Sequence, residues 1–199
     1  MSRPRDSQRS KVYAAEHASG IHKEGNTPLT IRECQALVDK MLDSAYVQRK
    51  YDPEGRAHWI GRYHYRYSQG IRVDLGKNGG RAFKHGAQRV IRLGLWGRQQ
   101  SVIIHEVAHH LADYRAKGDA RHNWEFCDVY LDLVRHFMGK DAHDKLKQAF
   151  KDHRVKFRKP RQKRQLTPEQ RQILVERAAK ARAARKANIE RAEAEASRQ

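Results

Sequence analysis

The sequence predicts an α+β fold in which a small, mostly antiparallel sheet packs on apolar helices and a basic helical tail follows. Three observations support this class. Apolar residues recur at helical spacing on both sides of residues 71–95, and that region itself contains short β-prone runs separated by glycines. The charge is uneven as well: the 199 residues carry a net charge of +19, and residues 151–199 alone contain 16 basic and 6 acidic side chains.

The chain is expected to have three parts. Residues 1–26 are polar and predict a flexible, mostly extended segment, in which only the apolar patch Val12–Ala15 is suited to docking on a core. Residues 27–150 contain the long apolar patterns and predict one globular domain. Residues 151–199 predict a basic linker followed by an exposed helix whose apolar stripe is mostly alanine.

Capping signals mark the start of the first predicted helix. Thr30 and Glu33 have the spacing of a capping box, so a helix should begin directly after Thr30. Its core-facing residues are Ile31, Cys34, Leu37, Val38, Met41 and Leu42. Farther along, the alternation of Tyr63, Tyr65 and Tyr67 predicts a half-buried strand with an aromatic face.

Three short runs then predict the sheet, namely Ile71–Leu75, Arg81–His85 and Gln88–Leu95. The glycine-rich run between the first two, residues 76–80, has the turn chemistry of a hairpin, which is why an antiparallel arrangement is expected. Three helices are predicted after the sheet, over Gln99–Tyr114, His122–Met138 and Asp141–Phe150, and a last one begins at Thr167.

The most informative segment is His105-Glu106-Val107-Ala108-His109, an H-E-x-x-H pattern. Residues four apart on a helix are separated by about 400°, so both imidazoles leave the same face one turn apart and can bind one metal ion. The surrounding residues are strongly apolar. Two histidines and a glutamate buried there would cost several kcal/mol without compensation, which a metal ion supplies.

Zinc is the expected ion, because it accepts imidazole nitrogens and in hydrolases binds three protein ligands and one water. The pKa of such a water falls to about 7, and a neighbouring carboxylate can take its proton as the water attacks a carbonyl. Glu106 is turned by about 100° from His105 on the helix, so it is assigned as the general base rather than as a ligand.

The third ligand must come from another part of the chain. A metzincin pattern would need glycine at position 112 and histidine at position 115, where this chain has Ala112 and Arg115. His122 and Glu125 remain as candidates near the start of the next predicted helix. His122 is on the face expected to point to the core, and an antiparallel packing of the two helices would bring it over His109.

These motifs resemble a known family. The run His105–Leu111, together with His122-Asn123-Trp124-Glu125-Phe126, resembles the small metallohydrolases of actinobacteria and their phages, which are similar to SprT-like zincins. The opening run Asp6–Tyr13 resembles that family too, and the likeness extends over roughly residues 6–140. One departure is Asn123, where the second motif of SprT-like proteins usually has glycine.

The resemblance implies a zincin-like fold built around an H-E-x-x-H helix. It implies His105, His109 and His122 as zinc ligands and Glu106 as the catalytic carboxylate. It also implies that the strand over Gln88–Leu95 lines the cleft, beside an extended peptide.

Two functional hypotheses follow. The first is a zinc-dependent hydrolase of the peptidase class, acting on a protein or peptide substrate, with a tail that binds nucleic acid. The second is a nucleic-acid-binding or scaffold protein with a structural or inactive metal site, in which residues 151–186 bind the nucleic acid.

A cytoplasmic protein is expected under either hypothesis. Cys34 and Cys127 are far apart and form no paired-thiol motif, so no disulfide framework is indicated. The first ten residues contain no apolar run of the kind found in secretory signals, and no stretch approaches the roughly 20 apolar residues of a membrane span.

Overall fold

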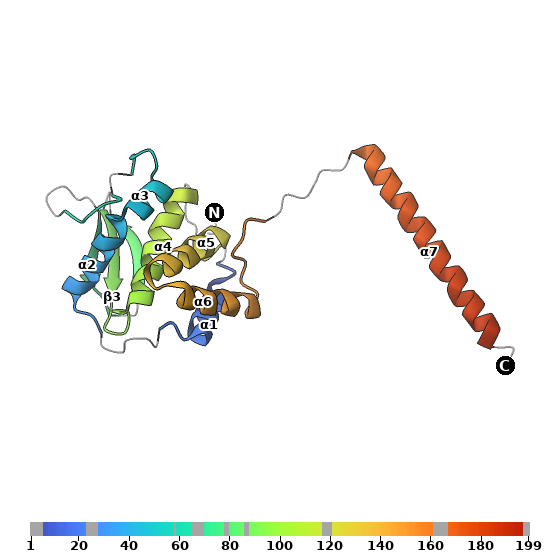
Figure 1. Ribbon diagram of the computed structural model, residues 1–199, viewed down its shortest axis with the longest axis horizontal. Coiled ribbons are helices and arrows are strands. Elements are labelled where there is room, and N and C mark those ends of the chain that lie inside the picture. The colour runs from blue at the N-terminus through green and yellow to red at the C-terminus, as the bar shows by residue number, and fades with distance from the viewer. Residues whose placement is uncertain are drawn as a thin grey trace. The chain divides into compact units, whose positions relative to one another are not determined.

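The computed structural model describes residues 6–22, 28–57, 59–64, 70–77, 80–85, 88–116, 121–160 and 167–196. It divides into two compact units, residues 1–159 and 160–199 (Figure 1). The first unit contains α1 (Arg9–Ser19), α2 (Ile31–Leu42), α3 (Ala45–Tyr51), β1 (Ile71–Leu75), β2 (Gly80–His85), β3 (Gln88–Leu93), α4 (Gln100–Ala116), α5 (Trp124–Phe137) and α6 (Lys140–Asp152). The second contains α7 (Pro168–Ala196). The predicted tyrosine strand falls largely outside the described residues.

The α+β class is confirmed, but the sheet is mixed rather than mostly antiparallel. The strand order is β1-β3-β2, in which β3 pairs in parallel with β1 and antiparallel with β2. The predicted hairpin between the first two strands is therefore wrong. Gly76 donates its N–H to the carbonyl of Leu93 over 2.9 Å, so the chain leaves β1 beside the end of β3. The most apolar strand, β3, takes the central position, where Val90, Ile91 and Leu93 are fully buried.

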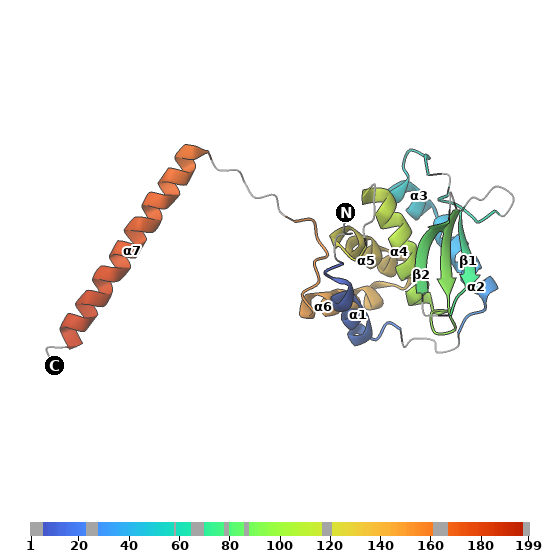
Figure 2. The same ribbon diagram turned by 180° about the vertical axis from the view of Figure 1, so that it is seen from behind.

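Helix α4 forms the centre of the first unit. It is buried almost all round, as expected of a helix enclosed by other elements, and only its last turn is largely exposed. Helices α2 and α4 cover one face of the sheet, with α2 next to β1 and α4 next to β2 (Figures 1 and 2). On its other side α4 packs against α5, which in turn packs against α6.

The N-terminal segment differs from the predicted, mostly extended chain. Residues 9–19 form α1, which packs on α6 and buries Val12, Ala15 and Glu16 (Figure 2). The patch expected to dock thus becomes one face of a helix, because burial of Val12 and Ala15 stabilises it against the loss of chain entropy.

The predicted boundary at residues 150 and 151 also differs from the observed division. Helix α6 continues to Asp152, and Val155 is buried, so residues 151–159 belong to the first unit.

The capping signals are confirmed. Thr30 accepts a hydrogen bond from the N–H of Glu33, whose carboxylate accepts one from the N–H of Thr30. At the start of α7, Thr167 and Gln170 exchange the same pair of bonds, over 3.2 and 3.3 Å. None of the helices within the described ranges is both long enough and apolar enough to cross a membrane.

Candidate metal centre

Three histidine side chains meet between α4 and α5. His105 and His109 lie one turn apart on α4, and their Nε2 atoms are 3.2 Å apart. His122, which precedes α5, brings its Nε2 to 3.3 Å from that of His105. One potential ligand atom from each of the three residues lies within 4.8 Å of the others, so the cluster is close enough to hold a metal ion.

Local structure explains how His122 reaches α4. Arg121 has a φ of 43°, which turns the chain just before the histidine. Asn123 then caps α5 by accepting a hydrogen bond from the N–H of Phe126 over 3.1 Å. The asparagine at the position where SprT-like proteins usually have glycine therefore starts the helix. The ring of Phe126 packs against all three imidazoles, with centroid distances of 4.2–4.9 Å.

Two carboxylates from the N-terminal segment bind the outer nitrogens of this cluster. His105 donates from Nδ1 to Oε1 of Glu16 over 2.5 Å, and His122 donates from Nδ1 to Oδ2 of Asp6 over 2.7 Å. A neutral imidazole that donates from Nδ1 has a lone pair on Nε2. The lone pairs of His105 and His122 thus face each other, an arrangement that is unfavourable unless a metal ion or a proton lies between them.

The electrostatics keep His109 neutral. Burial and the neighbouring imidazoles of His105 and His122 hold the pKa of His109 well below its usual value. Burial likewise lowers the pKa of His122, although Asp6 opposes that effect. For His105, burial alone would lower the pKa, but the carboxylate of Glu16 raises it above its usual value. The cluster therefore combines two imidazoles that favour the neutral form, His109 and His122, with a third, His105, that lies against a carboxylate, and such a layer of outer carboxylates suits a metal cation.

Glu106 lies beside this cluster and against the sheet. Its carboxyl group is buried, and this burial raises its pKa, while His105 and the backbone amide of Ala82 favour the charged form. The absence of a side chain at Gly80 makes room for it, because a Cβ at that position would lie 2.5 Å from Oε1 of Glu106. The sequence indicated only a turn role for Gly80, so this contact was missed.

An aromatic ring from α1 borders the histidines on another side. Tyr13 stacks on His105 at 5.7 Å and meets the edge of His122 at 5.2 Å, yet it stays 43% exposed. Both Glu106 and Glu16 are close enough to raise the pKa of its hydroxyl, although burial is the largest cause. A group at this position can contact solvent or a ligand above the cluster.

The structure brings together the three predicted ligands and sets other candidates apart. Within the described residues, the cluster able to hold an ion includes His122 and not Glu125. His110 points elsewhere, because its ring nitrogens lie 3.3 Å from Arg89 and from the carbonyl of Val90.

Neither Glu16 nor Asp6 was among the predicted site residues. One signal was available for Glu16, since it follows Val12 by four residues and would share the buried face of any helix formed there. Comparisons with known protein families, with characterised proteins and with solved structures find no match to this chain.

Proposed function

We propose that this protein is a zinc-dependent hydrolase of the peptidase class. The observation that carries the proposal is the spacing of the Nε2 atoms, 3.2 and 3.3 Å. Ligands at ~2.0–2.1 Å from a tetrahedral zinc ion are about 3.3–3.4 Å apart, so the measured spacing fits such an ion. His105, His109 and His122 would hold it, and a three-ligand site leaves one position open.

Zinc in this site would supply a Lewis acid that polarises a carbonyl and lowers the pKa of a bound water. The protein's own contribution to proton transfer comes from Glu106. As general base it takes a proton from the attacking water at a carboxylate oxygen and then passes that proton to the leaving amine. Its burial against Gly80 holds the carboxylate in place beside His105.

A peptide substrate is supported by the resemblance to SprT-like zincins and by the edge of the sheet. The expectation that β3 lines the cleft is wrong, because β3 is paired on both sides. Strand β2 is at the end of the strand order and packs on α4, and its Ala82 amide contacts Glu106. An extended peptide would pair with β2 beside the general base.

Metal analysis combined with Glu106→Gln tests the proposal. The purified full chain should contain about one equivalent of zinc and hydrolyse fluorescently labelled casein. Glu106→Gln should retain the zinc and lose activity by about 100-fold or more, because the proton acceptor is gone. Gly80→Ala should lower activity too, since the new methyl group displaces the carboxylate.

The matched control is Glu125→Gln, the same chemical change outside the cluster, which should leave hydrolysis unchanged. Wild-type protein that binds no zinc, or a Glu106→Gln variant as active as wild type, would contradict the proposal.

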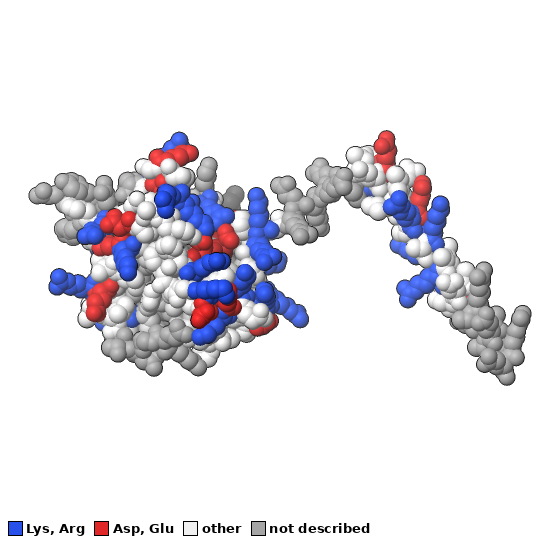
Figure 3. All heavy atoms as spheres, in the orientation of Figure 1, with Lys and Arg blue, Asp and Glu red and all other residues white. Residues whose placement is uncertain are grey.

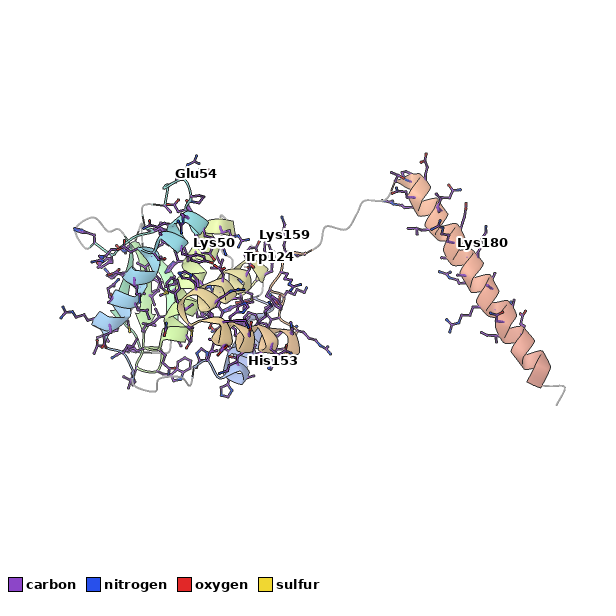
Figure 4. The ribbon with its side chains drawn as sticks, in the orientation of Figure 1. Lys50, Glu54, Trp124, His153, Lys159 and Lys180 are labelled. Carbon is purple, nitrogen blue, oxygen red and sulfur yellow. The ribbon has the colours of Figure 1, made fainter. Side chains whose placement is uncertain are left out.

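Nucleic-acid binding by the tail is a second candidate function. Residues 160–199 carry 11 basic and 5 acidic side chains, and every residue from Arg171 to Glu190 is exposed. Basic side chains such as Lys180 stand along α7 (Figures 3 and 4). A helix that is exposed over residues 171–190 and positively charged suits a phosphate backbone.

Deleting residues 160–199 tests this role. The full chain should bind duplex DNA with an affinity that falls steeply as salt increases, because bound counterions are released. The shortened chain should bind at least tenfold more weakly at low salt. Equal affinity of the two chains would exclude the tail as the binding element.

A further inference from the structure

We infer that helix α1 and the residues before it are a working part of the metal centre, with Asp6, Gln8 and Glu16 as positioning residues for the histidine ligands. The inference rests on the metal site proposed above and deepens it. Three separate side chains from one short segment contact two of the three ligands, and each contact bridges a long stretch of sequence.

Glu16 is the first of these residues. Its side chain is 4% exposed, and its Oε1 accepts the Nδ1 proton of His105 over 2.5 Å. A carboxylate buried this deeply is costly unless a donor satisfies it, and helix docking alone would be served better by an apolar residue. Its contact with the ligand explains its place on the buried face of α1.

The second contact point is His122, the ligand that comes from outside α4. Asp6 accepts the Nδ1 proton of its ring over 2.7 Å, and the side-chain amide of Gln8 donates to its backbone carbonyl over 3.0 Å. Both the ring and the main chain of His122 are therefore held from the N-terminal segment.

Gln8 also connects His122 to the C-terminal end of the first unit. Its Oε1 accepts the N–H of Lys156 over 2.6 Å, and its amide donates to the carbonyl of the same residue over 3.4 Å. The side chain is 9% exposed. Gln8 thus links His122 to the segment that follows α6, and it restrains the loop that presents the third ligand.

These contacts have a consequence for metal affinity. A carboxylate that accepts the Nδ1 proton selects the tautomer whose Nε2 can bind the ion, and it stops the ring from rotating. Removing such a partner weakens metal binding by about tenfold to hundredfold in known sites. If α1 served only to cover the core, isosteric changes at these positions would leave the affinity unchanged.

Zinc affinity and cobalt spectra of full-length variants test the inference. Glu16→Gln and Asp6→Asn should each bind zinc about tenfold to hundredfold more weakly in competition with a chromophoric chelator, and Gln8→Glu, which removes the donor to the carbonyl of His122, should also bind it more weakly. Their cobalt-substituted forms should have altered visible absorption, because the ligand geometry changes. Lys11→Gln, at an exposed position of the same helix, should match wild type in both measurements.

Folding is monitored by circular dichroism of the zinc-free proteins. Asp6 precedes α1 and is 22% exposed, so Asp6→Asn keeps the test valid even if Glu16→Gln fails to fold. Wild type that binds zinc alongside variants of equal affinity and identical cobalt spectra would overturn the inference and leave the proposed function intact. Wild type that binds no zinc would overturn both.

Discussion

Helix α5 borders two polar clusters that differ in how their donors and acceptors are matched. In the first, Asp132 accepts from the hydroxyls of Tyr46 and Tyr51 over 2.6 and 2.8 Å and from Lys50 over 2.5 Å. Each of these donors faces an acceptor. In the second, around His105, carboxylates accept the Nδ1 protons of His105 and His122, and the Nε2 atoms of His109 and His122 lie 3.2 and 3.3 Å from that of His105.

The difference separates a cluster whose groups complete one another from one that is close enough to hold a metal ion. The Asp132 cluster joins α3 to α5 through groups that complete one another, with Lys50 at its exposed side (Figure 4). The Nε2 lone pairs of His105 and His122 do not complete each other in this way, so a metal ion or a proton between the rings would stabilise the histidine cluster. Unmatched acceptors, rather than the number of polar groups, therefore distinguish the candidate metal centre.

Of the changes that test this difference between the clusters, metal removal should have the largest effect on stability. At a free zinc concentration about 1,000 times the dissociation constant, zinc should raise the free energy of unfolding by about 4 kcal/mol, because it binds only the folded chain. Thermal unfolding with and without a chelator measures the effect. His109→Ala should abolish this stabilisation by zinc. Equal unfolding temperatures for wild type with and without the chelator would contradict the assignment of the histidine cluster as a metal site.

Asp132→Ala should have the next largest effect, on stability alone. The substitution leaves the hydroxyls of Tyr46 and Tyr51 without their acceptor, so the free energy of unfolding should fall by about 2–3 kcal/mol. Zinc stoichiometry should not change. Urea unfolding measures the change in stability, and metal analysis measures the zinc content. The control is Asp128→Ala, which removes an exposed ion pair with Arg115 and should lower the free energy of unfolding by at most about 1 kcal/mol. Loss of zinc from Asp132→Ala would show that the clusters are coupled.

Acidification should remove the stabilisation by Asp132. Burial would raise the pKa of this carboxyl group, but hydrogen bonds from Lys50, Tyr46 and Tyr51 bring it below the ordinary value of 3.8. The charged form is therefore favoured by folding, so the stabilisation is present above pH 3.8 and is lost as the pH falls through the lower folded value. The free energies of unfolding of zinc-free wild type and zinc-free Asp132→Asn should differ less at about pH 3 than at about pH 5.5. A difference independent of pH would contradict the assigned ion pair.

Deleting residues 160–199 should have the smallest effect. These residues form a separate compact unit, and α7 buries no residue between Arg171 and Glu190. The free energy of unfolding of the remaining chain should change by no more than about 0.5 kcal/mol. Its zinc content should not change. A larger loss of stability would mean that the tail supports one of the two clusters.

The sequence by itself determined the features that depend on neighbouring residues. The capping pairs at Thr30 and Thr167 marked helix starts, because those hydrogen bonds join residues three apart. The H-E-x-x-H spacing determined that His105 and His109 share one helix face, as one turn of α-helix requires. Position on a predicted core face was enough to make His122 a candidate ligand.

Only the tertiary structure decided what distant segments contribute. Asp6 and His122 are 116 residues apart, and Glu16 and His105 are 89 apart, so no local pattern relates them. The central place of β3 and the contact of Gly80 with Glu106 likewise depend on how the sheet packs on α4. Local hydrogen bonds and periodicity determine elements, whereas strand order and partners of buried charges are chosen by the packing of the whole chain.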